Sequence, residues 1–192
     1  VLELPASVAA RDGRRDLLFV GGFRHPPNVD AVRWLVEAVL PVARRRLPEL
    51  RCHIVGADAP AEVLALGDHP GVVLHGHVPA LDGLLAGCLV SVAPLRYGAG
   101  VKGKVNQAMA WGLPVVATGC AVEGMHLRAG EDALVANTPE AFAEAIVRLH
   151  EDAALWRRLS ENGRGNVRRH FSFDAARQAL RPLLAGPRRA VG

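Results

Sequence analysis

Three glycines and two lysines lie together in the segment from Pro94 to Lys104, and their types and spacing suit phosphate binding. Gly98 and Gly100 carry no Cβ, so a ligand can approach the backbone closely. The segment joins a predicted strand to a predicted helix, and a helix N-terminus offers unpaired N–H groups to an anion. Lys102 and Lys104 add charge where the helix dipole disfavours it, unless an anion compensates.

Lys102 and Lys104 are the only lysines of a chain whose other cationic side chains are arginines. The alternative interpretation is that the two lysines lie together by chance at a solvated helix start. We favour phosphate binding, with two further residues from the loop after the first predicted strand. The predicted phosphate-binding residues are Gly22, Arg24, Gly98, Ala99, Gly100, Lys102 and Lys104.

Elsewhere the chemical signals are weaker. Gly21-Gly22 does not continue as G-x-G-x-x-G, and no P-loop motif is present, which disfavours a dinucleotide or P-loop site. Glu123 is the best-placed acid, although a solvated loop carboxylate is equally expected. The sequence has no paired carboxylates near the glycine loop and no nucleophile elbow, so it identifies no certain catalytic residue. The three cysteines are far apart without a C-x-x-C pair, and we predict no metal site.

The elements that must position these residues alternate between short apolar runs and helical patterns. Asn28 is predicted as the N-cap of a helix over Val29 to Arg46, which Pro41 should bend or end early. Thr138 is a predicted N-cap followed by proline, and three helices then run to about Leu184. The six predicted strands are Leu17–Val20, Cys52–Val55, Val72–His75, Leu89–Ala93, Pro114–Thr118 and Ala133–Val135.

Strands separated by single helices predict parallel pairing with right-handed crossovers. The expected fold is therefore α/β: a doubly wound, Rossmann-like, six-stranded parallel sheet with helices on both faces and extra C-terminal helices. In such sheets ligands bind at the carboxyl ends of the strands, which directs attention to the loops after the predicted strands.

Composition indicates a globular protein, with 50% hydrophobic and 22% charged residues. The net charge of +4 would suit an anionic ligand, an anionic membrane or nucleic acid, but solvated arginine-rich helix faces explain it more simply. We predict no nucleic-acid partner. No signal peptide or membrane-spanning run is evident, and the unpaired cysteines indicate a reducing, cytoplasmic compartment. Residues 1–15 are predicted to be a linker from a missing upstream domain, and residues 186–192 a disordered tail or a helix continuing elsewhere.

The run from Pro94 to Thr118, PLRYGAGVKGKVNQAMAWGLPVVAT, resembles the C-terminal domain of retaining GT-B glycosyltransferases of group 1 (GT4-like). Several shorter motifs follow the same order as in that family, so that the resemblance covers nearly the whole chain. These motifs are Phe19-Val20-Gly21-Gly22, Pro27-Asn28, Ile54-Val55-Gly56, Val73-Leu74-His75-Gly76-His77-Val78 and Glu123-Gly124.

The resemblance implies that residues 16–185 form one half of a GT-B fold and bind a nucleotide-diphosphate sugar. The other half, an N-terminal acceptor-binding domain, would be missing. It assigns Gln107 to the ribose and Arg96, Tyr97 and Glu123 to candidate contacts with the sugar. The candidates for the base are His75, Gly76, His77 and Val78.

The chain departs from the family pattern at two positions. A glutamate that usually contacts the donor sugar corresponds to Ala99, whose methyl side chain cannot make that contact. A second glutamate, which usually holds the ribose hydroxyls, corresponds to Gln107, a neutral and therefore weaker acceptor. An arginine and a lysine of the family correspond to Gly22 and Pro27, and Lys102 and Lys104 would supply the lost phosphate charge.

We expect a hexosyltransferase of bacterial polysaccharide synthesis, acting on a glycan, lipid or similar acceptor, with neither metal nor cofactor. The isolated domain should be inactive alone, and the two-domain protein could associate peripherally with the inner membrane face. A sugar-nucleotide epimerase of the same architecture and a non-catalytic nucleotide- or partner-binding module are the alternatives.

Overall fold

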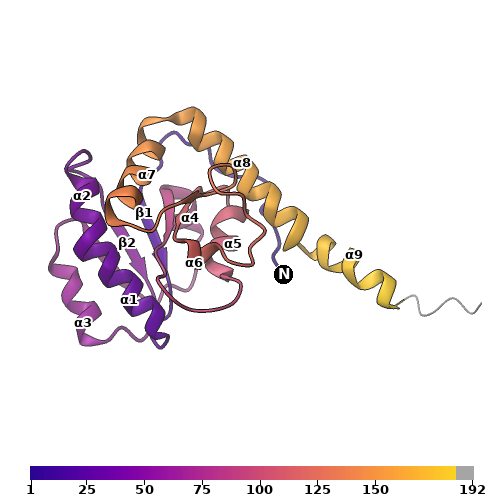
Figure 1. Ribbon diagram of the computed structural model, residues 1–192, viewed down its shortest axis with the longest axis horizontal. Coiled ribbons are helices and arrows are strands. Elements are labelled where there is room, and N and C mark those ends of the chain that lie inside the picture. The colour runs from indigo at the N-terminus through magenta and orange to yellow at the C-terminus, as the bar shows by residue number, and fades with distance from the viewer. Residues whose placement is uncertain (185–192) are drawn as a thin grey trace, which may run out of the picture.

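Six parallel strands form one sheet in the order β3-β2-β1-β4-β5-β6 in the computed structural model, which describes residues 1–184 (Figure 1). The predicted fold class is thereby confirmed. Each strand lies within two residues of its predicted bounds. The strands are β1 Arg15–Val20, β2 Cys52–Val55, β3 Val72–Gly76, β4 Cys88–Ala93, β5 Val115–Ala117 and β6 Leu134–Val135.

The central strands are uniformly apolar because helices cover both of their faces. Leu17, Leu18 and Phe19 of β1 are all fully buried, so no polar face alternates with an apolar one. Leu17 is in register with Cys52 of β2 and Val90 of β4. Their carboxyl ends therefore meet at one edge of the sheet, where the loops after β1 and β4 are neighbours.

Helices connect the strands and then cover the sheet. Two short elements have other geometries: a π-helical turn at Leu35–Val39 and a 3₁₀ turn at Ala65–Asp68. The α-helices are α1 Pro26–Trp34, α2 Leu40–Arg44, α3 Ala61–Leu64, α4 Asp82–Gly87, α5 Gly103–Ala110, α6 Gly119–Val122, α7 Pro139–Glu151, α8 Ala153–His170 and α9 Phe173–Leu184.

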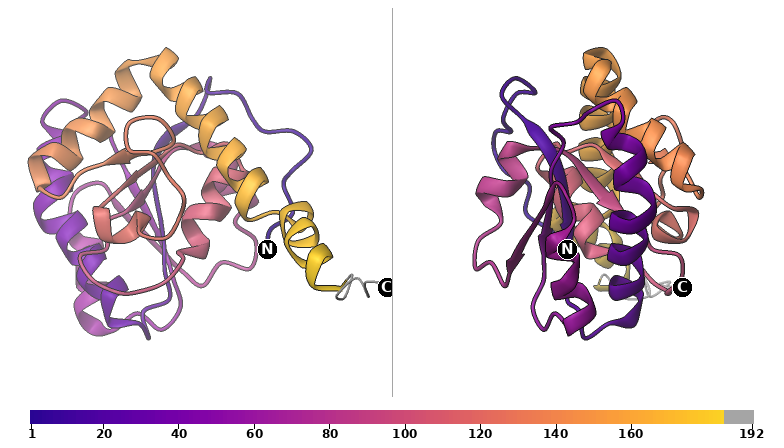
Figure 2. Two further views of the ribbon diagram at one scale, coloured as in Figure 1. Left: turned by 45° about the vertical axis from the view of Figure 1, so that its right-hand side comes forward. Right: turned by 90° about the vertical axis from the view of Figure 1, so that its left-hand side faces the viewer.

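The sheet lies between two helical layers, as the edge-on view in Figure 2 shows. The rod made by α1, the π-helical turn and α2 lies on one face, where α7 packs beside it. α4 lies on the opposite face. α8 packs against both α5 and α7, and α9 then projects away from the sheet (Figure 1). α5 is thus held between the sheet and α8.

The start of the first helix was predicted wrongly. It begins at Pro26, with His25 at the N-cap, so Asn28 lies inside the first turn and is not the N-cap. Two adjacent prolines fit this start, since the first helical N–H groups have no intrahelical partner. Pro41 does not end the rod, although it has no backbone N–H to donate to the preceding turn. The π-helical turn directly before it has a wider hydrogen-bond spacing, which accommodates the proline within the rod.

The segment before β1 is in contact with the rest of the domain. Arg14 is buried, and its guanidinium donates to the carbonyls of Leu85 and Cys88. Leu2 N donates to Phe171 O at 2.8 Å, so the segment before β1 packs on the body of the domain. Its assignment as a linker stays a prediction. The predicted tail at residues 186–192 lies outside the described residues.

Trp156 joins α8 to the sheet. It is 3% exposed, and its indole Nε1 donates to Leu89 O of β4 at 2.8 Å. We expect Trp156→Phe to lower the free energy of unfolding by about 1–3 kcal/mol, because it removes a buried donor and part of a packed ring. Urea unfolding followed by circular dichroism measures this loss. Trp34→Phe is the control, since the Trp34 ring packs edge-on against Phe142 without such a bond; equal losses would contradict the prediction.

Candidate functional site

A cavity of about 500 Å³ opens at the carboxyl edge of the sheet, between the loop after β1 and the loop from β4 to α5. This is where ligands bind in open parallel sheets. Its lining includes most of the predicted phosphate-binding residues. The pairing of β1 with β4 brings Gly22 and Lys104 to the same cavity, although they are about 80 residues apart in the sequence. The predicted residues that line the cavity are Gly22, Tyr97, Gly98, Ala99, Lys102 and Lys104.

Lys104 lies in the first turn of α5 and lines this cavity. The ammonium donates to Asn28 Oδ1 and lies 5.0 Å from the centroid of the Phe19 ring. Burial, with a smaller effect of the nearby Lys102 charge, lowers the pKa of Lys104 to about 8. Within residues 1–184 no carboxylate oxygen approaches this ammonium within salt-bridge distance.

Asn28 connects Lys104 to the loop after β1. Its side chain is 8% exposed in α1; Nδ2 donates to Gly22 O at 2.8 Å, and Oδ1 accepts from Lys104. Sequence reasoning missed this role because Asn before an apolar helical pattern is typical of an N-cap. The available signal was the strand-end position of the Pro27-Asn28 pair.

Gly21 is required by the close approach of these same groups. A Cβ at Gly21 would lie 2.8 Å from Asn28 Cγ and 3.0 Å from Lys104 Nζ. The Gly-Gly pair is therefore not part of a dinucleotide fingerprint. Its first glycine makes room for the asparagine and the lysine beneath the loop.

Lys102 has a different position from Lys104. Its ammonium donates to three successive carbonyls of its own loop: Gly98 at 3.2 Å, Ala99 at 2.9 Å and Gly100 at 2.8 Å. The two glycines adopt positive φ angles of 116° and 84°, which suit residues without a Cβ. The Lys102 charge therefore holds the loop closed over the start of α5.

The loop is also held from the following strand. Cys120 of α6 directs its thiol to Gly98 O at 3.3 Å, and the Lys102 backbone N lies 3.2 Å from Met125 Sδ. The residues after β5 therefore shape the cavity loop through sulfur contacts, which no sequence motif indicated.

Two predicted arginines are engaged elsewhere. Arg24 forms an ion pair with Asp58 at 2.9 Å and is largely exposed. Arg96 pairs with Asp30 of α1 through two hydrogen bonds. Neither lines the cavity in this structure, so neither places a free charge beside Lys104.

The predicted ribose, base and acidic sugar contacts lie outside the cavity lining. Gln107 is half-buried one turn along α5, and Glu123 is exposed after α6. At the end of β3, His75 Nε2 lies 2.8 Å from His53 Nδ1 on β2, and the two rings stack. His75 is thus tied to the neighbouring strand, while Gly76, His77 and Val78 form the start of the next loop.

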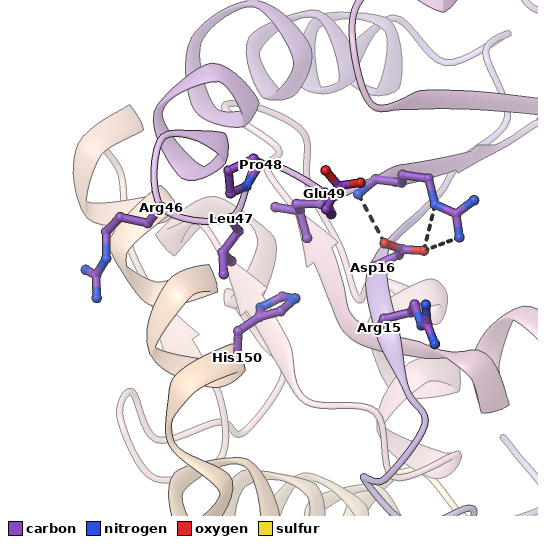
Figure 3. Close-up of a pocket in the computed structure, with 9 residues that line it drawn as sticks. Arg15, Asp16, Arg46, Leu47, Pro48, Glu49 and His150 are labelled. Atoms are coloured by element: carbon purple, nitrogen blue, oxygen red, sulfur yellow. Dashed lines mark hydrogen bonds and ion pairs between the residues drawn. The ribbon is translucent and has the colours of Figure 1, made fainter.

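A second cavity, of about 630 Å³, lies at the amino end of the sheet (Figure 3). It is larger, but its buried acid is already paired: Asp16 accepts two hydrogen bonds from the Arg51 guanidinium, at 2.8 and 3.1 Å, while Glu49 is exposed. Arg46 at its margin pairs with Glu144 and Glu151 of α7. We place the candidate site in the smaller cavity because it lies at the carboxyl edge and holds the Lys104 ammonium, a partly buried charge without a carboxylate partner.

Residues 1–184 hold neither a metal-binding cluster nor a membrane-spanning helix. No group of three His, Cys, Asp or Glu side chains there is arranged to hold a metal ion. No described helix combines the length and the apolar character needed to cross a membrane.

Comparison with known proteins gives the relationship of this chain. Residues 14–152 match the family model described as glycosyl transferases group 1. An uncharacterized 44.6 kDa protein of the cps region of Klebsiella pneumoniae is 23% identical over 164 residues, which are 81% of this chain and 42% of that protein. The chain thus spans less than half of this relative.

Two solved structures have the same fold. The pneumococcal O-GlcNAc transferase GtfA, in complex with UDP and GlcNAc, superposes with a TM-score of 0.73 at 16% identity, over 95% of this chain and 38% of its own. The C-terminal domain of the group 1 glycosyl transferase LpcC from Francisella tularensis gives 0.66 at 14% identity, over 86% of this chain and 89% of its own. The chain belongs to the group 1 glycosyltransferases, and its fold is that of the C-terminal half of their GT-B architecture.

Proposed function

We propose that this chain is the donor-binding domain of a hexosyltransferase and that its carboxyl-edge cavity binds the diphosphate of a nucleotide sugar. The observation that carries the proposal is the Lys104 ammonium, which is partly buried in the cavity lining without a carboxylate partner. A buried charge is costly unless it is compensated, and a ligand phosphate would compensate it. The N-terminal turn of α5 contains no acidic residue and adds its unpaired N–H groups to the same place.

The relatives support a nucleotide as ligand. GtfA was solved with UDP and GlcNAc, and HepE of Anabaena, which has a TM-score of 0.70 to this chain, with UDP and glucose. At 15–16% identity these proteins share the fold, so their ligands only suggest which nucleotides to try first.

The remaining contacts are proposed from their positions around this diphosphate. Tyr97, which is 48% exposed beside the cavity, would face the sugar, with Arg96 and Glu123 further along the same edge. Gln107 would hold the ribose, and the loop from His75 to Val78 the base. We further propose that Lys104 and the start of α5, rather than a metal ion or a cofactor, meet the phosphate charge. A second domain would supply the glycan or lipid acceptor.

Titration calorimetry with UDP, GDP, ADP, TDP, UMP and uridine tests the proposal. We expect at least one nucleoside diphosphate to bind at pH 7, and its monophosphate to bind at least tenfold more weakly, because the second phosphate makes the charge-assisted contact. Equal affinity for diphosphate and nucleoside would place recognition outside the glycine loop. Absence of binding by every nucleotide would favour a domain that binds only other partners.

A further inference from the structure

The Lys104 ammonium is surrounded by groups that do not neutralise it. Its hydrogen-bond acceptor in the structure is the neutral Asn28 amide, and its other close contact is the Phe19 ring face. Charged neighbours on the adjoining elements are either cationic or already paired: Lys102 is cationic, and Asp30 of α1 is held by Arg96. His25 also lines the cavity, from the N-cap of α1.

We propose that Asn28 is a positioning residue, and that the Asn28–Lys104 pair, rather than Lys104 alone, recognises the diphosphate. The inference rests on the proposed function of the cavity. Asn28 belongs to the first turn of α1 and Lys104 to the first turn of α5, so their contact fixes the starts of these two helices relative to each other.

Only an amide satisfies both neighbours of Asn28. Nδ2 must donate to the Gly22 carbonyl while Oδ1 accepts from Lys104, which fixes the orientation of the group. A carboxylate would set an anion against the Gly22 carbonyl and would neutralise Lys104 before a ligand arrives. An aliphatic side chain of the same size would leave both the carbonyl and the ammonium without a partner.

This arrangement couples ligand binding to the Lys104 proton. Because the pKa of Lys104 is about 8 in the free protein, a bound diphosphate would raise it by stabilising the charged form. The contribution of Lys104 to affinity should then be largest well below pH 8 and should fall as pH rises through 8, since the bound state retains a proton that the free protein has lost.

The two lysines make a direct test possible. In protein labelled with ¹³C-lysine, Lys102 and Lys104 give two sets of side-chain resonances, and Lys102→Arg assigns them by leaving only one. We expect Asn28→Asp to move the Lys104 titration to higher pH and Asn28→Leu to move it to lower pH. Asn162→Asp on α8 is the matched control with the same charge change, and it should leave the titration unchanged.

The second readout is the affinity for UDP and for pyrophosphate between pH 6.5 and 9.5. We expect Asn28→Asp to weaken both ligands at least tenfold at pH 7 and to move the decline in affinity upward from pH 8. Lysine titrations that are identical in wild type, Asn28→Asp and Asn28→Leu would overturn the positioning role, as would unchanged affinity in Asn28→Asp. If the titrations shift but wild-type protein binds neither ligand, the proposed function fails while the asparagine–lysine coupling stands.

Discussion

Replacing Lys104 by methionine should weaken the binding of a nucleoside diphosphate about a hundredfold at pH 7. A charge-assisted hydrogen bond contributes about 1.5–3 kcal/mol, and a hundredfold change corresponds to about 2.7 kcal/mol. Methionine retains the length of the aliphatic stem, so it can pack against the Phe19 ring while it removes the charge. Calorimetry with the tightest-binding nucleotide measures the loss.

Lys102→Met is the comparison that separates two lysines of the same loop. The Lys102 ammonium already bonds to the Gly98, Ala99 and Gly100 carbonyls, so its removal should loosen the loop and cost less affinity than Lys104→Met. Equal losses would mean that both ammonium groups contact the ligand, as the sequence alone suggested. Retention of full affinity by Lys104→Met would refute the proposed phosphate site.

The chain by itself should transfer no sugar at an enzymatic rate, even with a donor bound. None of the described residues that line the cavity is acidic, so the cavity wall supplies no carboxylate to act as a general base. Positioning of two reactants can account for roughly 7–11 kcal/mol of a reaction barrier, and the acceptor contacts would come from a second domain. Closure of that domain would also exclude water from the donor.

Release of UDP from UDP-glucose and UDP-GlcNAc, followed with and without candidate acceptors, tests this expectation. The Lys104→Met protein serves as the control for contaminating hydrolases, since its background should equal that of the wild-type chain. Turnover of about 1 s⁻¹ or more that depends on Lys104 would lie in the range of ordinary enzymes. It would show that these 192 residues hold a complete catalytic site.

Periodicity and strand-end chemistry predicted the sheet well, because a parallel strand buried on both faces is an apolar run bounded by glycine or proline. Thr138 does cap α7, where its hydroxyl accepts from Ala141 N at 3.3 Å, so a capping residue followed by proline was a reliable signal. Asn28 followed the same rule and failed, because the prolines before it started the helix three residues earlier than predicted. Local preference could not show that its amide had partners in a distant helix.

The site was predicted in part. The glycine loop and both lysines line one cavity as expected, since glycines, charge and a helix start coincide in sequence. The difference between the two lysines could not be predicted, because it depends on which ammonium faces the loop carbonyls and which faces α1. The sequence also offered Arg24 as a phosphate contact and Arg96 as a sugar contact. In the fold Arg24 pairs with Asp58 and Arg96 pairs with Asp30, and neither pair could be predicted because its partners are distant in the sequence.

The concentration of both lysines at one cavity has a practical consequence for handling the protein. Apart from the α-amino group, reagents that modify primary amines find their targets only at Lys102 and Lys104. Coupling to a sensor surface through amines, or labelling with an activated ester, would therefore modify the lining of the candidate cavity instead of a part of the surface that is remote from it. Attachment through an affinity tag avoids this, while partial acylation followed by mass spectrometry becomes a footprint of whatever ligand occupies the cavity.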